Sequence, residues 1–409
     1  MELFPREKYL ARMRNFYDAD DLIKVITGIR RCGKSCLMQT IAAELRSRGV
    51  KEENIIFIDL DKRGYGKIKR PEQLEAIIEE KTYVNGLKYV FIDEIQNVDG
   101  FENVINAFRN EGDYSIFITG SNSYLLSGEL ITKLTGRYIE FELYPLTLDE
   151  FIEMKLYYGK SIPSDRQDLL NQYILEGGFP RSIFFDELSD KHMYVQSIIT
   201  EIFAKDIKKR IKIRDRDAFD KVQSYIINNF AATTSIVNLC KAMKRSGITV
   251  SRPTVIRYVQ ALVDAKILIA CDRFDMKSKK SLSGEKKYYL SDLSFYYAMN
   301  TDNRINYGPS LENIVCLYAK SMNYKLSIGR IGKLECDFIL RSKDMDYCYV
   351  QVAYTILSGR DTEDREYRSL EAIKDNYAKY IMTMDGLIQK RNGIIHVNLL
   401  DFMRNRLKF

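Results

Sequence analysis

Residues 22–39 read LIKVITGIRRCGKSCLMQ. The first six of them have the β-branched and apolar content of a buried strand. Gly28 and Gly33 allow the next turn to bend tightly enough for consecutive backbone N–H groups to point inward. Lys34 and Ser35 then open a helix whose positive end faces the same turn. The stretch therefore predicts a phosphate-binding turn between a buried strand and a helix.

The spacing of Gly28, Gly33, Lys34 and Ser35 fits the Walker A pattern of nucleotide-binding proteins. In that pattern the lysine reaches the β- and γ-phosphates of ATP, and the serine hydroxyl binds Mg²⁺. An ordinary glycine-rich turn is the alternative, and the flanking strand and helix argue against it. We therefore expect ATP and Mg²⁺ as cofactors, held by Gly28, Ile29, Arg30, Arg31, Cys32, Gly33, Lys34, Ser35 and Cys36.

Strands and helices alternate through the first third of the chain. Strands rich in Ile, Val and Phe that alternate with helices form parallel sheets covered on both faces. The sequence therefore predicts an α/β fold of the P-loop NTPase class. The pattern places strands near 22–27, 54–60, 88–92, 115–119 and 138–144, and helices near 36–48, 71–81 and 101–108.

The strand near 88–92 ends in two acids, Asp93 and Glu94. A strand that ends in two acids is commonplace, but downstream of a Walker A match it is specific. Asp93 is expected to bind Mg²⁺ beside Ser35. Glu94 is expected to orient and deprotonate the water that attacks ATP.

Two further polar sites follow in the sequence. The strand in residues 115–122 (SIFITGSN) ends in Ser121 and Asn122, either of which can hold the attacking water from the other side. A plain turn is the alternative for both residues. Arg137 is an arginine-finger candidate for the γ-phosphate, with a surface salt bridge as the alternative. The expected catalytic residues are Lys34, Glu94, Asn122 and Arg137.

Seven runs of the sequence carry a family resemblance: VITGIRRCGKS (25–35), YVFIDEIQNV (89–98), IFITGSN (116–122), LTGRYIEFELYPLTLDEF (134–151), LEGGFP (175–180), EIFAKDIKKRIKIRD (201–215) and KKYYLSDLSFYYAM (286–299). Together they resemble the bacterial and archaeal AAA-type ATPases that carry a characteristic C-terminal domain of unknown function. The resemblance implies that Gly28 to Ser35 bind phosphate, that Asp93 and Glu94 serve magnesium and water, and that Arg137 is the finger. Cys32 stands where relatives usually have a small aliphatic residue.

Composition limits the location and the partners. The chain has 409 residues, and we expect about two to four domains. It has no apolar run of membrane-spanning length and no apolar signal core at its start, which favours the cytoplasm and no membrane. Seven cysteines without a CxxC pair and two distant histidines disfavour a disulfide framework and a histidine-based metal site.

Positive charge is concentrated in the middle of the chain. Residues 201–290 contain 20 Lys and Arg against 9 Asp and Glu, a net of +11, whereas the whole chain carries +7. A basic block inside a near-neutral protein indicates a polyanionic partner. DNA is the expected partner, while a homo-oligomer and protein partners stay open.

Within this block, residues 236–243 and 251–264 are predicted to form a helix-turn-helix, capped by Ser251. A lysine-rich hairpin at 277–287 would supply the wing of a winged helix. A protein-contact role is the alternative. Val255, Val259 and Leu262 should face the core, with Ala261 on the opposite side. The expected DNA contacts are Arg252, Thr254, Arg257, Lys279, Lys280, Lys286 and Lys287.

The order of elements after residue 310 resembles the restriction-endonuclease-like fold. Asp337 matches its metal-binding aspartate, but Gln351 and Ala353 stand where its acid and its lysine would be. We therefore predict that this domain does not cut DNA, since that chemistry needs two carboxylates and a lysine. The alternative is a migrated site in which Lys333 and Glu335 join Asp337 on one strand face, with Glu312 as a further possible acid.

We accordingly expect a P-loop ATPase core at 1–145, a helical lid at 146–212, a winged helix at 213–292 and an endonuclease-like domain at 293–409. The expected function is Mg²⁺-dependent ATP hydrolysis that couples nucleotide state to DNA binding. The alternatives are a nucleotide-gated switch with slow hydrolysis and an ATP-regulated nuclease.

Overall fold

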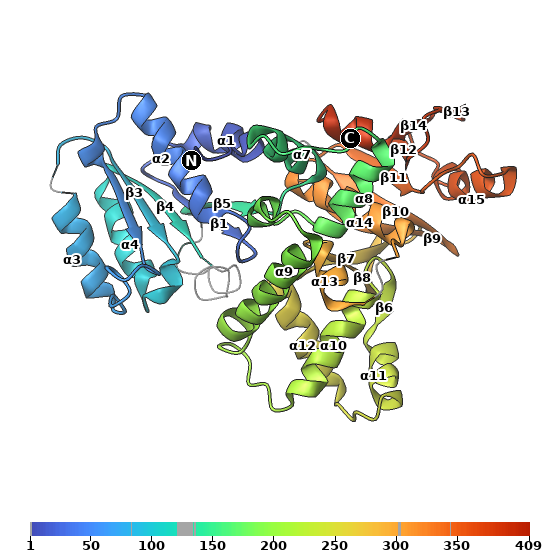
Figure 1. The fold of residues 1–409 in the computed structure, drawn as a ribbon, viewed down its shortest axis with the longest axis horizontal. Helices are drawn as coiled ribbons and strands as arrows, with labels where there is room; N and C mark the ends of the chain where they lie inside the picture. The colour runs from blue at the N-terminus through green and yellow to red at the C-terminus, as the bar shows by residue number, and fades with distance from the viewer. Residues whose placement is uncertain (1, 83, 121–133, 135, 302–303, 344) are drawn as a thin grey trace. The chain divides into compact units, whose positions relative to one another are not determined.

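The computed structural model describes residues 2–82, 84–120, 134, 136–301, 304–343 and 345–409. It divides the chain into two compact units, Met1–Tyr144 and Pro145–Phe409 (Figure 1). The division lies one residue before the boundary predicted at residue 145, and the three domains predicted beyond it fall within one unit. None of the described helices combines the length and the hydrophobicity that crossing a membrane requires.

A parallel sheet of five strands, in the order β2-β3-β4-β1-β5, forms the centre of the first unit. Its strands are β1 (Ile23–Gly28), β2 (Ile55–Asp59), β3 (Lys88–Asp93), β4 (Tyr114–Thr119) and β5 (Tyr138–Leu143). Every pairing is parallel, so the carboxyl ends of all five strands lie at one edge. The predicted parallel sheet is therefore confirmed.

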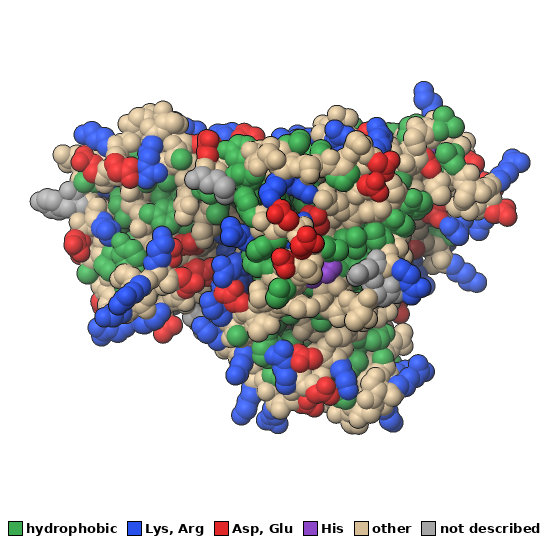
Figure 2. Space-filling view, viewed as in Figure 1, with side chains coloured by type: hydrophobic (Ala, Val, Ile, Leu, Met, Phe, Trp, Pro, Cys, Tyr) green, Lys and Arg blue, Asp and Glu red, His purple; other side chains and the backbone are tan. Residues whose placement is uncertain are grey.

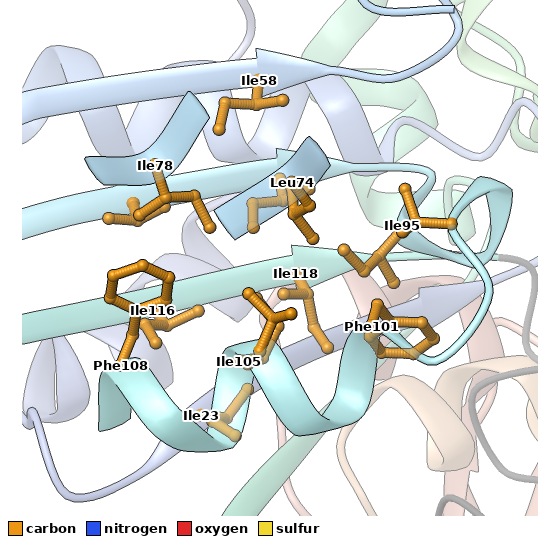
Figure 3. Packing of buried hydrophobic residues seen from close by; sticks show 14 of the residues in the cluster. Ile23, Ile58, Leu74, Ile78, Ile95, Phe101, Ile105, Phe108, Ile116 and Ile118 are labelled. Atoms are coloured by element: carbon orange, nitrogen blue, oxygen red, sulfur yellow. The ribbon is translucent and has the colours of Figure 1, made fainter. Parts of the chain in front are cut away.

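Helices cover both faces of this sheet. They are α1 (Glu7–Met13), α2 (Lys34–Ser47), α3 (Pro71–Lys81) and α4 (Phe101–Glu111). On the face covered by α3 and α4, alternate strand residues and both helices build one apolar core (Figure 3). Figure 3 labels Ile23, Ile58, Leu74, Ile78, Ile95, Phe101, Ile105, Phe108, Ile116 and Ile118.

The opposite face of the sheet carries a stack of aromatic rings. Phe57, Phe91 and Phe117 lie on adjacent strands, with ring centroids 5.7 and 4.7 Å apart. Tyr17 packs edge-on against Phe117. Because side chains alternate along a strand, these rings and the aliphatic core separate onto the two faces, which fixes the register of the strands.

The second unit contains a mixed sheet of nine strands, in the order β13-β14-β12-β11-β10-β9-β7-β8-β6. Its strands are β6 (Thr233–Ser235), β7 (Leu268–Asp275), β8 (Lys280–Leu290), β9 (Lys325–Ile331), β10 (Leu334–Arg341), β11 (Tyr347–Val352), β12 (Ala378–Thr383), β13 (Lys390–Arg391) and β14 (Ile394–Asn398).

Its helices surround this sheet and extend beyond it (Figure 1). They are α7 (Leu148–Tyr157), α8 (Arg166–Glu176), α9 (Leu188–Ile202), α10 (Arg216–Asn228), α11 (Ile236–Arg245), α12 (Arg252–Asp264), α13 (Ser294–Met299), α14 (Tyr307–Ser321), α15 (Arg360–Glu371) and α16 (Leu399–Arg404).

The lysine-rich hairpin β7–β8 belongs to the same sheet as the C-terminal strands. The end of β7 pairs in parallel with β9, and Arg273 lies opposite Ile328. Beyond the last paired residue, the Met276 N–H donates to the Arg330 carbonyl at 3.0 Å. The predicted wing therefore shares one sheet with strands of the predicted endonuclease-like domain. Pairing with β9 satisfies backbone groups that an isolated hairpin edge would leave open.

Two of the sequence runs that carry the family resemblance meet inside the second unit. Asp292 is fully buried, and its carboxylate accepts hydrogen bonds from the Gly178 N–H at 2.8 Å and the Ser294 N–H at 2.9 Å. A Cβ on Gly177 would lie 2.0 Å from the Asp292 carboxylate, and one on Gly178 would lie 2.2 Å from the Leu146 carbonyl. The two glycines of LEGGFP therefore serve close packing.

Candidate functional site

The P-loop turn joins the carboxyl end of β1 to the first residue of α2. Gly28 has φ +148°, and a Cβ there would lie 2.2 Å from the Leu143 carbonyl oxygen, so only glycine fits. Gly33 has φ +105° and precedes the first helical residue. Ile29 and Cys32 are buried beneath the turn, whereas Arg31, also in the left-handed region, is exposed.

The remaining predicted nucleotide-binding residues surround this turn. Lys34 is buried, and its ammonium donates to the Gly28 carbonyl at 3.0 Å and to the Ile29 carbonyl at 3.3 Å. No side chain caps the amino end of α2, so its first N–H groups are directed at the turn. Such an end is suited to an anion. Arg30 is half-buried, and Cys36 lies on an exposed part of α2.

Asp93 ends β3, next to Ser35. Its carboxyl is almost completely buried and accepts a hydrogen bond from the Thr119 hydroxyl. Burial raises the pKa of Asp93, while hydrogen bonds from Ser35 and Thr119 act in the opposite direction. A hydroxyl and a carboxylate side by side are oxygen ligands of the kind that Mg²⁺ prefers, so the donor set fits this cation.

Glu94 follows with a strained backbone, φ +56° in the left-handed region. Its N–H donates to the Thr119 hydroxyl at 3.1 Å, and Gln96 donates to its carboxylate. Strain of this kind occurs at functional sites, where the surrounding structure enforces it. The Thr119 hydroxyl therefore contacts both acids, at the carboxylate of Asp93 and at the backbone N–H of Glu94.

Sequence reasoning missed Thr119 and Gln96. Thr119 ends β4, the strand beside β3. Because the carboxyl ends of parallel strands meet at one edge of the sheet, this position could have identified Thr119 as a neighbour of Asp93 and Glu94. Ser121 and Asn122, which were expected to hold the water, lie outside the described residues, and that prediction is untested.

Arg137 lies at the other edge of the sheet. Its carbonyl accepts from the Ile23 N–H at 2.9 Å, immediately before β5 and at the start of β1. At about 3.3 Å per residue, the length of β1 separates Arg137 from Gly28 by about 16 Å. Within one domain, Arg137 is thus far from the P-loop. A finger role would require the nucleotide of a second copy, and it stays a prediction.

Arg6 was not anticipated from the sequence. Its buried guanidinium donates to the Tyr144 carbonyl at 2.8 Å and to the Cys32 carbonyl of the P-loop at 3.3 Å. The N-terminal segment therefore fixes the back of the P-loop to the end of the first unit. A single arginine in an N-terminal segment carries no sequence pattern that reveals this contact.

The predicted DNA contacts on α12 divide into two groups. Arg252 and Arg257 are exposed. The Thr254 hydroxyl is instead 2.9 Å from that of Ser251, which caps the helix, so Thr254 belongs to the cap. Val255, Val259 and Leu262 are buried as expected, but Ala261 is buried too, and its predicted outward position is wrong.

The predicted contacts on the hairpin also divide. Lys279 and Lys280 are exposed at the turn between β7 and β8. Lys286 is partly exposed and pairs with Asp272 at 2.8 Å. Lys287 points to the opposite face of β8 and is buried, so its prediction as a DNA contact is wrong. The period of two along a strand separates these adjacent lysines.

Lys287 lies among three acids, with which it forms what we call the Lys287 cluster: Lys287, Glu312, Glu335 and Asp337. Its ammonium is 2.9 Å from Glu312, 3.0 Å from Glu335 and 3.6 Å from Asp337. The Tyr289 hydroxyl donates at 3.2 Å to the same Glu312 oxygen that Lys287 contacts. A lysine of the hairpin thus neutralises acids of α14 and β10.

Electrostatics in the cluster follow from burial. Burial lowers the pKa of Lys287, but the attraction of Asp337, Glu312 and Glu335 outweighs it and leaves that pKa above the ordinary value. Burial raises the pKa of Asp337 and of Glu312, against the opposing effect of Lys287. Lys287 therefore keeps its charge, and the acids depend on it.

The residues of the endonuclease-like pattern are not arranged around an open cation site. Asp337 accepts from the Val352 N–H at 2.8 Å, while Gln351 bonds Glu366 and Ser369 at 3.2 and 3.0 Å. Lys333 is exposed in the turn between β9 and β10 and takes no part in the Lys287 cluster. Among the residues that the structure describes, no group of three or more His, Cys, Asp or Glu is arranged to hold a metal ion.

The parallel five-stranded sheet, the P-loop turn and the two acids at the carboxyl end of β3 define a nucleotide-binding domain of the P-loop class. A family model described as an AAA domain matches residues 20–152. A second model, described as a domain of unknown function (DUF8612), matches residues 167–305. The second match crosses the boundaries predicted at 212 and 292, which agrees with one compact unit in this part of the chain.

Two relatives match nearly the whole chain. A protein of Haemophilus influenzae, named only as uncharacterised, is 32% identical over 382 residues, which cover 93% of either chain. The protein MJ1544 of Methanocaldococcus jannaschii is 27% identical over 390 residues, which cover 92% of this chain and 84% of the relative. The chain therefore belongs to the same family as the Haemophilus influenzae protein.

Among solved structures, the Walker-type ATPase PABY2304 of Pyrococcus abyssi is similar, with a TM-score of 0.51 and 14% identity. The similarity covers 73% of this chain and 96% of that chain, and it shows the fold. The match to the AAA-domain model over residues 20–152 confirms the prediction that the chain is an ATPase of the AAA type.

Proposed function

We propose that this ATPase uses Mg²⁺ to hydrolyse ATP and that the bound nucleotide controls its binding to DNA. The observation that carries the proposal is the meeting of Lys34, Ser35, Asp93 and Glu94 at the carboxyl edge of one parallel sheet. Ligands of open α/β sheets bind outside this edge.

Each of these residues has a separate task. Backbone N–H groups of the turn and of α2 bind the phosphates, and Lys34 exchanges its two carbonyl partners for phosphate oxygens. Ser35 and Asp93 would hold Mg²⁺, which would supply positive charge to offset that of the phosphates. Glu94 accepts a proton from the attacking water, and Thr119 keeps its backbone in place.

We infer that residues 216–290 act as a winged helix that binds DNA. Helices α11 and α12 follow one another as in a helix-turn-helix, whose second helix contacts base edges from its N-terminal part. Arg252 and Arg257 lie in that part of α12 and are exposed. Neither pairs with a carboxylate of the described residues, so both are available to phosphates or base edges.

A matched pair of variants tests the ATPase assignment. Lys34→Ala should lose affinity for ATP, because it removes a ground-state phosphate contact. Glu94→Gln should bind ATP as the wild type does. Its rate of hydrolysis should be lower by a factor of about a hundred or more, as expected for loss of a general base. Calorimetric ATP binding and phosphate release would separate the two effects. A Glu94→Gln enzyme that hydrolyses at the wild-type rate would remove Glu94 from the mechanism.

The coupling to DNA is tested with the Glu94→Gln protein, which should hold ATP without consuming it. Its affinity for a fluorescent DNA duplex should differ between ATP and ADP, because the proposal links nucleotide state to DNA binding. Equal affinities in the two states would contradict the coupling, and an absence of DNA binding would favour a protein partner for residues 216–290.

Two other functions make different predictions. A nucleotide-gated switch would hydrolyse ATP slowly, with no stimulation by DNA. An ATP-regulated nuclease would need an open cation site, but Lys287 already occupies the centre of the acids around Asp337. We therefore expect supercoiled and linear DNA to stay intact with Mg²⁺ or Mn²⁺, with or without ATP. Cleavage that disappears in Asp337→Ala but persists in Lys34→Ala would establish the nuclease.

A further inference from the structure

A short basic run connects α9 to α10 in the second unit. Residues 205–216 read KDIKKRIKIRDR. The run starts in a π-helical turn, Phe203–Ile207, and ends at the first residue of α10. Turns of this kind are frequent at functional sites. Between its first and second aspartates the run has no acid and contains Lys208, Lys209, Arg210, Lys212 and Arg214.

Apolar residues fix the direction in which the cations point. Ile207 is buried, and Ile211 and Ile213 are partly buried. Lys212 and Arg214 alternate with these isoleucines and are exposed. The isoleucines therefore anchor the run while its cations face solvent.

The cations at the two ends of the run differ from those inside it. Lys205 pairs with Glu201 at 2.9 Å, and Arg216 pairs with Asp220 at 2.7 Å. By contrast, four cations inside the run have no carboxylate partner in the part of the chain that the structure describes: Lys208, Lys209, Lys212 and Arg214. These four are not committed to holding the fold together.

The end of the run lies next to helix α12. The Tyr258 hydroxyl donates to the Asp215 carbonyl at 3.5 Å, and the Tyr258 ring packs on Phe219 with centroids 5.2 Å apart. Arg257 precedes Tyr258, just as Arg214 precedes Asp215. Figure 2 shows Lys and Arg side chains along the outer edge of the part that holds α10, α11 and α12. The unpaired cations of the run and of α12 thus belong to neighbouring segments.

We propose that residues 208–214, which we call the basic segment, bind the phosphate backbone of duplex DNA beside α12. Phosphate binding needs cations alone, whereas a protein interface also needs an apolar centre. No large apolar side chain is exposed among the described residues between Met193 and Val237. This chemistry favours a nucleic acid over an acidic protein.

The inference rests on the proposed DNA binding and gives it a surface that the hairpin does not supply. The hairpin was the predicted wing, but Lys287 is buried and Lys286 is paired. Within the described residues, the basic segment has four cations without a carboxylate partner, Lys208, Lys209, Lys212 and Arg214, whereas the hairpin keeps three, Lys277, Lys279 and Lys280.

The test compares two charge-matched variants of the full chain in binding to a labelled duplex of mixed sequence, between 50 and 200 mM salt. The segment variant replaces four cations with alanine: Lys208, Lys209, Lys212 and Arg214. The control variant replaces four exposed lysines outside the basic segment and α12 that also lack carboxylate partners: Lys343, Lys374, Lys390 and Lys408.

The segment variant should lose affinity, and its slope of log affinity against log salt should fall by about 0.9 per lost contact, up to about 3.6. The control should keep the wild-type slope. If the fourfold variant fails to fold, the pairs Lys208→Ala/Lys209→Ala and Lys212→Ala/Arg214→Ala should each remove about half of the slope change.

The outcomes separate the inference from the proposed function. If the wild type does not bind DNA, both fail. If the wild type binds DNA and the segment variant keeps its slope, only the basic segment is refuted, and loss of binding in Lys279→Ala/Lys280→Ala would assign the contact to the hairpin. Competition by polyglutamate as strong as that of unlabelled DNA would instead assign the segment to acidic proteins.

Discussion

Replacing Lys287 with methionine tests whether the Lys287 cluster holds the hairpin to the C-terminal strands. The lysine side chain is only 6% exposed and lies within 3.6 Å of three carboxylates. Removing one partner of a buried ion pair costs about 3–5 kcal/mol, because the opposite charge stays buried without compensation. Arg273 still pairs with Glu335 at 2.9 Å, so Glu312 and Asp337 bear most of the loss.

For a unit of this size, about 1 kcal/mol corresponds to about 2–4 °C in Tm. The transition of the second unit should therefore fall by about 6–20 °C in differential scanning calorimetry at neutral pH. Adding Glu312→Gln to Lys287→Met should recover part of the loss, because one of the unpaired charges is then removed.

Lys286→Met is the matched control. Lys286 is the adjacent residue, is partly exposed and makes one ion pair with Asp272. Such a pair contributes about 0–1 kcal/mol, so the control should shift Tm by about 4 °C at most. A Lys287→Met protein that melts with the wild type but binds DNA less tightly would refute the cluster and restore Lys287 as a DNA contact.

Three further predictions concern the first unit. Arg137→Ala should lose ATPase activity, and mixing it with Glu94→Gln protein should restore part of the rate in mixed oligomers; an unchanged rate in demonstrably mixed particles would argue for a structural role. Arg6→Ala should weaken ATP binding about fivefold, because it frees the Cys32 carbonyl from a hydrogen bond of about 1 kcal/mol, whereas unchanged calorimetric affinity would confine Arg6 to folding. Burial lowers the pKa of Lys24 to about 7, so between that value and its usual 10.5 the unfolded state binds more protons and stability rises with pH. Lys24→Met should remove up to about 2–3 kcal/mol of the rise between pH 7 and 9, and an equal rise in both proteins, measured by urea unfolding, would contradict this role.

The first unit, which contains the P-loop, could be predicted because its sequence motifs are local. The Walker A spacing from Gly28 to Ser35 fixes the turn, and the alternation of strands and helices fixes the parallel sheet. Asp93 and Glu94 follow from their place at the end of a buried strand. Thr119 could have been added by the same reasoning, since it ends the neighbouring strand.

The position of Arg137 could also have been derived from strand direction. A residue that precedes a parallel strand lies at the amino edge of the sheet, opposite the P-loop. The prediction of a role in ATP hydrolysis for Arg137 rested on its sequence pattern alone and did not consider which edge of the sheet the residue occupies. At this edge a finger role would require the nucleotide of a second copy, and that role stays a prediction.

The second unit was harder to predict because its organisation depends on distant pairings. The pattern of β8 shows that Lys286 and Lys287 face opposite sides, but not which side is buried. That is decided by the pairing of β7 with β9 and by acids that follow Lys287 in the sequence, Glu312 on α14 and Asp337 on β10. Charge counts in residues 201–290 likewise do not distinguish paired cations from free ones.

The steady-state ATPase rate with Mg²⁺, with and without duplex DNA, decides whether this ATPase uses Glu94 and is coupled to DNA when the wild type and Glu94→Gln are measured side by side. We predict that DNA stimulates hydrolysis by the wild type. The Glu94→Gln rate should be lower than the wild-type rate by a factor of about a hundred or more, with or without DNA. Equal rates for the two proteins, or a wild-type rate that DNA does not change, would contradict an ATPase that uses Glu94 and is coupled to DNA.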